Sequence, residues 1–316
     1  MRSPSKKNSS AKQVDRFRRL ARKVIEHHFG SKAALIRYKS GGLSNYVFEA
    51  RHSAGNFIVR ISPDKAGLNA FIKEHWCEQA ARKAGIPTAE ILETGASIIP
   101  FPYVIARSVS GMPAERHPER SLILRELGRM AAKINAIATQ GFGETFDWSN
   151  NELSRNASLK EYLENEYCYR ARIETLERSR LCPVATAKSL KRIFAQMTSM
   201  RVKPMLSHGD VRLKNVIADE KGKITAIIDW EKATSNVTPH WELSVALHDL
   251  GVDEKQLFID GYGMKPKTIN EIVPFVKAFN LLNYTDEINR ASAAKDKKAL
   301  ERMRMRFDGV FDLYSL

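Results

Sequence analysis

The spacing of the apolar residues changes from a strand pattern to a helical pattern near residue 110, and this change constrains the fold most. Before it, short alternating runs separated by turn residues predict strands at 35–38, 46–51, 56–61, 90–94 and 102–109. One helix interrupts the strands, with Leu68, Phe71 and Trp76 on its apolar face, and ends at Gly85-Ile86-Pro87. The first part of the chain therefore predicts a small antiparallel sheet with one inserted helix.

After Ser110-Gly111-Met112-Pro113 the apolar spacing is mainly helical. The first helical stripe runs from Leu122 to Ile137. Further helices are predicted near 158–180, 184–199, 239–250, 267–292 and 294–313. We therefore expect an α+β fold in which a small, strand-rich N-lobe precedes a larger, mainly helical C-lobe. The expected boundaries are 31–109 for the N-lobe and 110–316 for the C-lobe.

Residues 1–30 are expected to form a basic tail and an N-terminal helix whose apolar face includes Phe17, Ala21 and Val24. The chain carries a net charge of +15, and residues 1–23 contribute nine Lys or Arg against one Asp, or +8. A basic segment can bind nucleic acid or an anionic membrane. Because no nucleic-acid motif accompanies the charges, we expect a solvated tail rather than a nucleic-acid partner.

The composition excludes several classes of protein. No apolar run approaches the roughly 18 residues that a membrane span needs. The N-terminus lacks the apolar core of a signal peptide, so we expect a cytoplasmic protein. Cys77, Cys168 and Cys182 are too few and too widely spaced for a disulfide framework or a zinc motif. No feature indicates an obligate protein partner.

The stretch SHGDVRLKNVIADEKGKITAIIDWEKA at 207–233 predicts a β-hairpin, because two apolar runs flank a polar turn that contains Gly222. If Asp219 faces Ile224 across the hairpin, Asn215 faces Ile228. Asn215 and Asp229 then meet at the open end of the hairpin, and Asp210 leads into the same end.

Two carboxylates and an amide oxygen at one point repel each other unless a cation lies between them. Oxygen ligands of this kind suit a hard ion such as Mg²⁺. A turn or a cap would account for Asp210, Asn215 or Asp229 taken alone, but it does not account for all three together behind His208-Gly209.

A glycine pair lies between the first two predicted strands, in Gly41-Gly42-Leu43-Ser44-Asn45. Glycines allow close approach of the backbone, and small residues with free N–H groups can hold phosphate oxygens. The same residues could form only a turn. No GxxxxGK[ST] motif is present, so a Walker-type phosphate loop is excluded.

Arg60 lies within the third predicted strand, beside the apolar Val59 and Ile61. A charge in such surroundings needs a partner or a ligand. Glu74 is one turn beyond Phe71, at the edge of the apolar stripe of the next helix. A strand cation paired with a helix carboxylate is the arrangement that kinases use to hold nucleotide phosphates.

Taken in order, the glycine loop, Arg60, Glu74, the HGD-x4-N loop and the IDW aspartate resemble the aminoglycoside phosphotransferase and choline kinase-like family. The resemblance covers most of residues 31–262. ITAIIDWEKA, followed by Trp241-Glu242, is similar to hygromycin-type phosphotransferases. The resemblance implies a two-lobed protein-kinase-like fold and transfer of the γ-phosphate of ATP, or of GTP, to a hydroxyl of a small molecule.

The resemblance also implies roles for individual residues. Asp210 would be the catalytic base, with Arg212 near the transferred phosphate, while Asn215 and Asp229 would hold Mg²⁺. The residues implied in nucleotide binding are Gly41, Gly42, Ser44, Asn45, Arg60, Glu74, Arg107 and Val109. Protein kinases use Lys where this chain has Arg60. Arg107 stands where relatives often have an acidic hinge residue, which leaves the choice between ATP and GTP open.

The sequence does not identify the phosphate acceptor. An aminoglycoside such as hygromycin, choline, homoserine and a sugar-like metabolite all stay open. Several residues could line an acidic pocket for a cationic substrate, although we expect them to be solvated helix faces: Trp241, Glu242, Asp249, Asp253, Asp260, Asp286 and Glu287. The alternative function is a non-catalytic kinase-fold binding protein whose basic tail attaches to nucleic acid or membrane.

Overall fold

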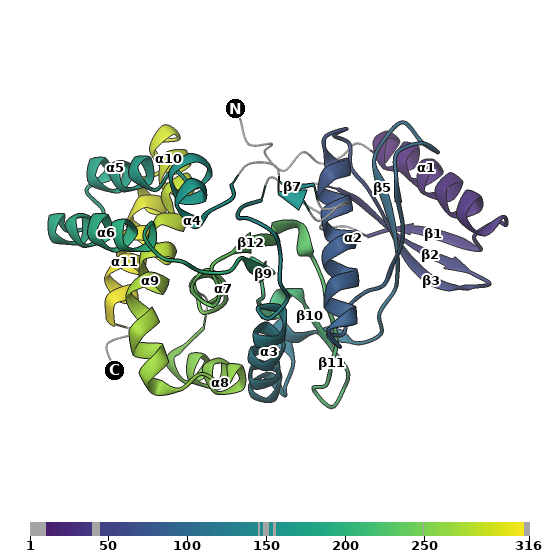
Figure 1. The fold of residues 1–316 in the computed structure, drawn as a ribbon. Helices are drawn as coiled ribbons and strands as arrows, with labels where there is room; N and C mark the ends of the chain where they lie inside the picture. Colours follow the sequence, from purple (N-terminus) through teal and green to yellow (C-terminus); the bar gives the residue numbers. More distant parts are fainter. Residues whose placement is uncertain are drawn as a thin grey trace.

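A computed structural model describes residues 11–39, 45–144, 146–147, 152–153, 156–248 and 250–312. The chain forms a sheet-containing lobe and a larger helical lobe, as Figure 1 shows. The α+β, kinase-like architecture predicted from the sequence is therefore confirmed. The exact boundaries between tail, N-lobe and C-lobe stay a prediction.

The N-lobe contains a five-stranded antiparallel sheet in the order β1-β2-β3-β5-β4. Its strands are β1 (Leu35–Tyr38), β2 (Tyr46–His52), β3 (Gly55–Ile61), β4 (Ile91–Gly95) and β5 (Tyr103–Arg107). All five strands lie where the alternating runs predicted them. The last strand ends at Arg107 rather than at Val109.

Two helices cover opposite faces of this sheet (Figure 1). Helix α1 (Ala11–Phe29) packs Phe17 and its other apolar residues against Val59 and the side chains on the same face of the sheet. Helix α2 (Gly67–Lys83) packs Phe71 against Val104 on the other face. Because successive strand residues point to opposite faces, Arg60 points toward α2 while Val59 points toward α1.

Helix α2 also belongs to the core of the helical lobe. Its Cys77 and Ala81 are fully buried in a cluster with Ile123 of α3 (Arg120–Ile134) and Ile227 of the hairpin at 216–227. The chain just after α2 is tied to the same hairpin, because the Ile227 N–H donates to Pro87 O at 2.9 Å. The helix that carries Glu74 is thus fixed to the lobe that carries Asp229.

The helical lobe is built mainly from seven longer helices. They are α3 (Arg120–Ile134), α5 (Tyr169–Ser179), α6 (Val184–Met197), α8 (Val252–Tyr262), α9 (Pro266–Asn283), α10 (Thr285–Ala293) and α11 (Lys297–Asp312). The shorter α4 (Leu159–Glu161) and α7 (His240–Ala246) lie among them, and α4 continues into a π-helical turn at Tyr162–Glu166.

Several details of this lobe differ from the prediction. The helix expected over 267–292 is divided at Tyr284 into α9 and α10. Cys168 adopts a left-handed conformation with φ 51°, and this interrupts the helix expected over 158–180. Helix α8 was not predicted, because only Lys255 and Phe258 of its residues are buried and no apolar stripe marks it. Leu122 of the first predicted stripe is 54% exposed, so the buried stripe begins at Ile123.

The predicted hairpin is present as β10 (Val216–Ala218) and β11 (Ile224–Ile227), with β6 (Met112–Pro113) pairing beside β10. Ile217 faces Ala226 as the sequence predicted. A bulge then shifts the register, so Ala218 faces Ile224 and the Asp219 N–H donates to Lys223 O at 2.9 Å.

A second pair, β9 (Met205–Ser207) with β12 (Thr234–Asn236), flanks the loop before the hairpin. A third pair joins β7 (Phe146–Asp147) to β8 (Glu152–Leu153).

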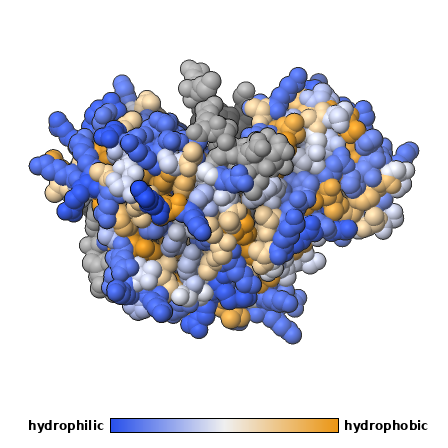
Figure 2. Space-filling model, in the orientation of Figure 1, coloured by the Kyte–Doolittle hydropathy of each residue, from blue (hydrophilic) through white to orange (hydrophobic). Residues whose placement is uncertain are grey.

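Polar and apolar side chains are interspersed on the face of the molecule in Figure 2. In the part of the chain that the structure describes, no helix combines the length and the apolar character needed to cross a bilayer.

Candidate active site

The loop that carries Asp210 runs from the end of β9 to the 3₁₀ helix η3 (Leu213–Asn215). Gly209 adopts a φ of +72°, and a Cβ at this position would lie 2.1 Å from Lys232 O. Only glycine fits this contact without displacing the backbone. The contact places Gly209, which directly precedes Asp210, against the turn η4 (Trp230–Lys232) that follows Asp229.

Asp210 is 2% exposed, and both of its carboxylate oxygens contact cations. Arg212 Nε donates to Oδ1, and Lys214 Nζ lies 2.7 Å from Oδ2. Burial works to raise the pKa of Asp210, but hydrogen bonds and charge from Arg212 and Lys214 outweigh it and lower the pKa. The carboxyl group is therefore ionised at neutral pH, the state that a proton acceptor needs. Lys214 was not singled out in the sequence.

Asn215 links this loop to the end of the hairpin. Its side-chain Nδ2 donates to the backbone O of Asp210 at 2.9 Å, and its backbone carbonyl accepts from the Ile228 N–H at 2.9 Å. Asp229 follows directly in a left-handed conformation with φ 69°, which turns the chain sharply at the strand end. The structure thus places Asn215 one hydrogen bond away from the residue that precedes Asp229, as the hairpin geometry predicted.

His208 supports the same arrangement. Its Nδ1 faces the Asp210 N–H at 3.2 Å, so Nε2 carries the proton and donates to Ile228 O at 3.2 Å. Burial lowers the pKa of His208 to about 4, so the ring is neutral at pH 7. The ring also packs against Trp230, with 4.4 Å between centroids. These contacts fix the loop rather than supply a proton.

Glu242 of α7 is fully buried beneath the loop that carries Asp210. Its carboxylate accepts hydrogen bonds from the N–H groups of His208 at 2.7 Å and Gly209 at 3.2 Å. Asn135 Nδ2 of α3 donates a third at 3.2 Å. The expectation that Glu242 lines an acceptor pocket or a solvated face is therefore wrong: it holds the backbone of the loop that presents Asp210.

The buried carboxyl group of Glu242 is expected to make the stability of the protein depend on pH. Burial raises its pKa to about 7 from an ordinary 4.5, against the opposing effect of the three N–H donors. Because the folded state binds this proton more tightly, the contribution of Glu242 to stability is full below about pH 4.5 and falls as the pH rises to about 7. Between these two pH values, we expect the free energy of unfolding to fall by up to about 1.4 kcal/mol for each pH unit. Denaturation of the wild type and of Glu242→Gln from pH 5 to 7.5 checks this, since only the wild type should show the added slope. Equal slopes would contradict it.

On the sheet side, Arg60 and Glu74 form the predicted pair. Arg60 Nη1 lies 3.3 Å from Oε1 of Glu74, and Nη2 makes a closer contact with Oε2. The side chain of Glu74 is 3% exposed and that of Arg60 is 21% exposed. The pair is thus bidentate and partly open on the Arg60 side, where a phosphate could reach the guanidinium.

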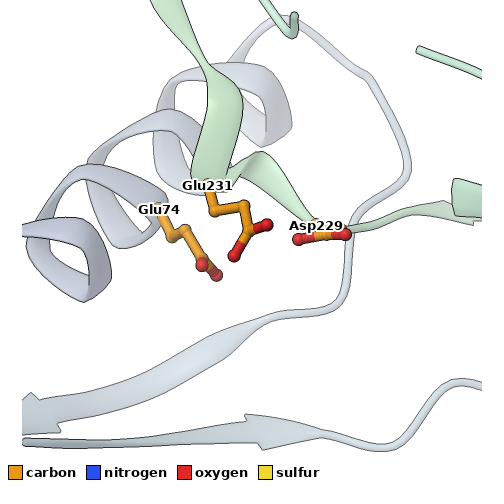
Figure 3. A group of neighbouring side chains, drawn as sticks. All are labelled: Glu74, Asp229 and Glu231. Carbon is orange, nitrogen blue, oxygen red and sulfur yellow. The ribbon is translucent and has the colours of Figure 1, made fainter. Parts of the chain in front are cut away.

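A third carboxylate joins this group, and the sequence reasoning missed it. Figure 3 shows Glu231 of η4 pointing toward Glu74 of α2 and toward Asp229. One oxygen from each of the three residues lies within 4.8 Å of the others. Burial, followed by the charges of Asp229 and Glu74, raises the pKa of Glu231. Arg60 interacts with all three acids and offsets part of their charge.

The predicted phosphate loop can be checked only at Asn45, which lies directly before β2 and is partly buried. Gly41, Gly42 and Ser44 lie outside the described residues.

At the interlobe connection, where the sequence predicts contacts with the nucleobase, two backbone N–H groups are already hydrogen-bonded within the protein. The N–H of Arg107 donates to Glu90 O at 2.8 Å, and the N–H of Ser108 donates to Asn56 O at 2.9 Å. The Arg107 side chain also pairs with Glu90, with 2.7 Å between Nε and Oε2. Val109 is the next residue, and within the described chain its N–H group, unlike those of Arg107 and Ser108, has no hydrogen-bond partner.

A cavity of about 610 Å³ opens beside Asp210. Its wall includes Gly209, Asp210, Arg212 and Lys232 around the catalytic loop. The rest of the wall combines aromatic, amide and carboxylate side chains with Arg172, Ser244, Val245 and His248, and includes Glu144, Tyr162, Glu166, Tyr167, Trp241, Asn280, Asn283, Tyr284, Asp286 and Glu287. This volume suits a small-molecule ligand.

The sequence prediction for the acidic residues is therefore only partly correct. Trp241, Asp286 and Glu287 line the cavity, where Asp286 pairs with Arg172 at 3.2 Å. Asp253 and Asp260 lie on α8, away from the cavity wall. Asp249 lies outside the described residues.

Comparison with solved structures shows the same fold in several aminoglycoside phosphotransferases. APH(4)-Ia is 18% identical with a TM-score of 0.69, and the alignment covers 97% of this chain and 100% of that one. A putative aminoglycoside phosphotransferase from Ralstonia eutropha JMP134 is 14% identical with a TM-score of 0.63, covering 93% and 97%. APH(2")-IIIa, in complex with GDP and kanamycin, is 15% identical with a TM-score of 0.58, covering 92% and 96%.

No curated protein matches the sequence significantly. The sequence profile of the phosphotransferase enzyme family (APH), however, matches residues 36–268, which is most of the chain and includes the sheet, the catalytic loop and the hairpin. The chain belongs to the phosphotransferase enzyme family.

Proposed function

We propose that this phosphotransferase moves the γ-phosphate of ATP or GTP to a hydroxyl group of a small molecule bound in the cavity beside Asp210. The observation that carries the proposal is the position of Asp210. It is an ionised, 2% exposed carboxylate that forms part of the cavity wall and is joined by Asn215 to the Asp229 end of the hairpin.

Asp210 is the proposed base. The acceptor oxygen forms a bond to the γ-phosphorus, the bond from that phosphorus to the bridging oxygen breaks, and the nucleoside diphosphate leaves with the electron pair. The proton of the acceptor hydroxyl passes to the Asp210 carboxylate. Arg60, held by Glu74, and Arg212 supply positive charge around the phosphates, which such a transition state requires more than covalent help.

Asn215 and Asp229 are the proposed ligands of a divalent cation. Asn215 Nδ2 is committed to Asp210 O, which leaves the amide oxygen, the atom that a hard cation binds, for a ligand. The carboxylate of Asp229 adds charge at the same end of the hairpin. A bound Mg²⁺ would neutralise charge on the nucleotide phosphates. Glu231 lies near enough to Asp229 to contribute to the same negative field.

The acceptor proposal depends on the cavity. Four carboxylates, Glu144, Glu166, Asp286 and Glu287, and an aromatic wall face three cations, Arg172, Arg212 and Lys232. Because Asp286 is paired with Arg172, the other three acids are the groups that would attract an alcohol with amino groups, while the rings suit a hydrophobic ring face. The solved relatives support this class, because one was crystallised with ADP and hygromycin B and another with GDP and kanamycin. An aminoglycoside is therefore the first acceptor to test, followed by choline, homoserine and simple sugars.

A nucleotide-consumption screen tests the proposal. The protein is incubated with Mg·ATP or Mg·GTP and each acceptor, and diphosphate release is followed against Asp210→Asn as the inactive control. Acceptor-dependent release that EDTA abolishes would support the proposal. Failure of Mg·ATP and Mg·GTP to bind would reject it in favour of a non-catalytic binding protein, for which salt-sensitive retention on nucleic acid or anionic vesicles is the direct test.

Asp229→Ala is expected to weaken Mg·ATP binding at least roughly tenfold, the scale of losses at metal sites. Removing the carboxylate should weaken metal-free ATP binding much less, because only the metal-bound form gains from a negative ligand. Titration calorimetry with Mg²⁺ and with EDTA separates the two. Asp253→Ala, an exposed position on α8, is the matched control. An equal loss with and without Mg²⁺ would count against metal binding by Asp229.

A further inference from the structure

Helix α1 carries a row of cations on the face that points away from the sheet. Four exposed side chains follow one another along this face: Lys12, Arg16, Arg19 and Lys23. The 3.6-residue repeat of a helix places all four within an arc of about 60°, and the 1.5 Å rise for each residue makes the row about 16 Å long. These four residues form a cationic stripe.

The charge of the stripe is not neutralised within the protein. Among the described residues, Lys12, Arg19 and Lys23 form no ion pair or hydrogen bond. The guanidinium of Arg16 lies over the ring of Phe101, 5.3 Å from its centroid, a contact that orients the side chain without cancelling its charge. The stripe therefore presents four positive charges to an anionic partner.

The acids beside the stripe are too few to balance it. Asp15 pairs with Arg18 on the same helix, and Glu26 has its Oε1 atom buried. Residues 11–39 carry nine Lys or Arg against these two acids, a net charge of +7. That is nearly half of the +15 of the whole chain. The positive charge is thus concentrated around α1 rather than spread evenly over the surface.

The outward face of α1 suits phosphates better than a lipid layer or exposed bases. The apolar residues of the helix, among them Phe17 and Val24, are buried against the sheet, so this helix has no apolar face left to enter a bilayer. The stripe also contains no aromatic ring for stacking on single-stranded bases and no Asn or Gln for reading base edges. A straight row of Lys and Arg instead complements the closely spaced phosphates of a duplex.

We propose that the cationic stripe of α1 binds the phosphate backbone of a nucleic-acid duplex without reading its sequence. The missing nucleic-acid motif agrees with this binding mode, because contacts to phosphates carry no sequence information. No described residue of α1 lines the cavity beside Asp210, and Figure 1 shows α1 on the side of the sheet that faces away from the helical lobe. A duplex on the stripe leaves that cavity accessible, so the inference does not depend on the proposed phosphotransfer.

Fluorescence anisotropy of a labelled duplex of mixed sequence, titrated with the full chain at about 50–200 mM salt, tests the proposal. A duplex of about 15 base pairs is roughly three times as long as the stripe. Four phosphate contacts predict that the logarithm of the binding constant falls against the logarithm of the salt concentration with a slope of about −3.6. Arg19→Gln combined with Lys23→Gln should reduce the slope to about −1.8 and weaken binding about 10- to 100-fold at about 100 mM salt.

The matched control is Lys188→Gln combined with Arg192→Gln. It removes one Lys and one Arg, also four residues apart, from exposed positions on α6 of the helical lobe. This control should keep the wild-type slope, and so should Arg19→Lys combined with Lys23→Arg, which keeps both charges on the stripe. Each side chain is exposed, so the thermal midpoint of every variant should match that of the wild type.

Equal losses in the α1 and α6 variants would overturn the inference, because the stripe would then act only through the net charge. A wild type that binds anionic vesicles but no duplex would overturn it as well, since a lipid surface would be the partner. Duplex RNA and duplex DNA should both bind, because the stripe has no group devoted to the 2′-hydroxyl. Binding of only one of them, or of one sequence only, would contradict contact through phosphates alone.

Discussion

Asp210→Asn is expected to lower kcat by about 10²–10⁴-fold, the contribution of a well-placed general base. The amide has nearly the same shape as the carboxylate, so the protein should remain folded and should still bind nucleotide. It cannot accept the acceptor proton, and it also loses the negative charge that holds Arg212 and Lys214. Steady-state kinetics with an acceptor found in the screen measures the effect.

The control is Asp253→Asn, which makes the same chemical change at an exposed position on α8. It should keep the wild-type kcat. Retention of more than about a tenth of the wild-type kcat by Asp210→Asn, where loss of a base should cost at least a hundredfold, would remove Asp210 from the role of base. Nucleotide affinity measured in parallel separates a chemical defect from a binding defect.

Glu242→Ala is expected to cause the largest loss of stability of any single substitution discussed, about 3 kcal/mol or more. The change leaves three buried N–H donors, from His208, Gly209 and Asn135, without an acceptor. Each unsatisfied donor costs about 1–3 kcal/mol. Total stabilities are usually about 5–15 kcal/mol, so this loss is a large fraction.

Chemical denaturation at pH 7 measures the change in unfolding free energy. Glu220→Ala, in the exposed turn of the hairpin, is the matched control and should stay within about 0.5 kcal/mol of the wild type. A loss below about 1 kcal/mol for Glu242→Ala, less than one unsatisfied donor should cost, would mean that water replaces the carboxylate. In that case the catalytic loop would not depend on α7.

The parts of the site that follow from local pattern could be predicted from the sequence. Alternation along β3 places Arg60 on the face opposite Val59, and helical spacing places Glu74 one turn beyond Phe71. The hairpin pattern likewise places Asn215 beside the residue before Asp229. Each of these placements follows from the two-residue repeat of a strand, the 3.6-residue repeat of a helix, or the geometry of a short turn.

The rest depends on packing between elements that are distant in the sequence. Glu242 reaches the catalytic loop only because α7 packs beneath it, and no local pattern marks that contact. Glu231 approaches Glu74 through the turn η4, whose direction is set by the left-handed Asp229. Lys214 pairs with Asp210 four residues away, but in the sequence it was one basic residue among many.

The dual packing of α2 has a consequence for how the two lobes can move. Cys77 and Ala81 of α2 are embedded in the helical lobe, whereas Phe71 of the same helix packs on the sheet that carries Arg60. A rotation of the sheet against the helical lobe would therefore have to be accommodated at α2, where Glu74 pairs with Arg60. A spectroscopic probe of that one ion pair would therefore respond to movement between the two lobes.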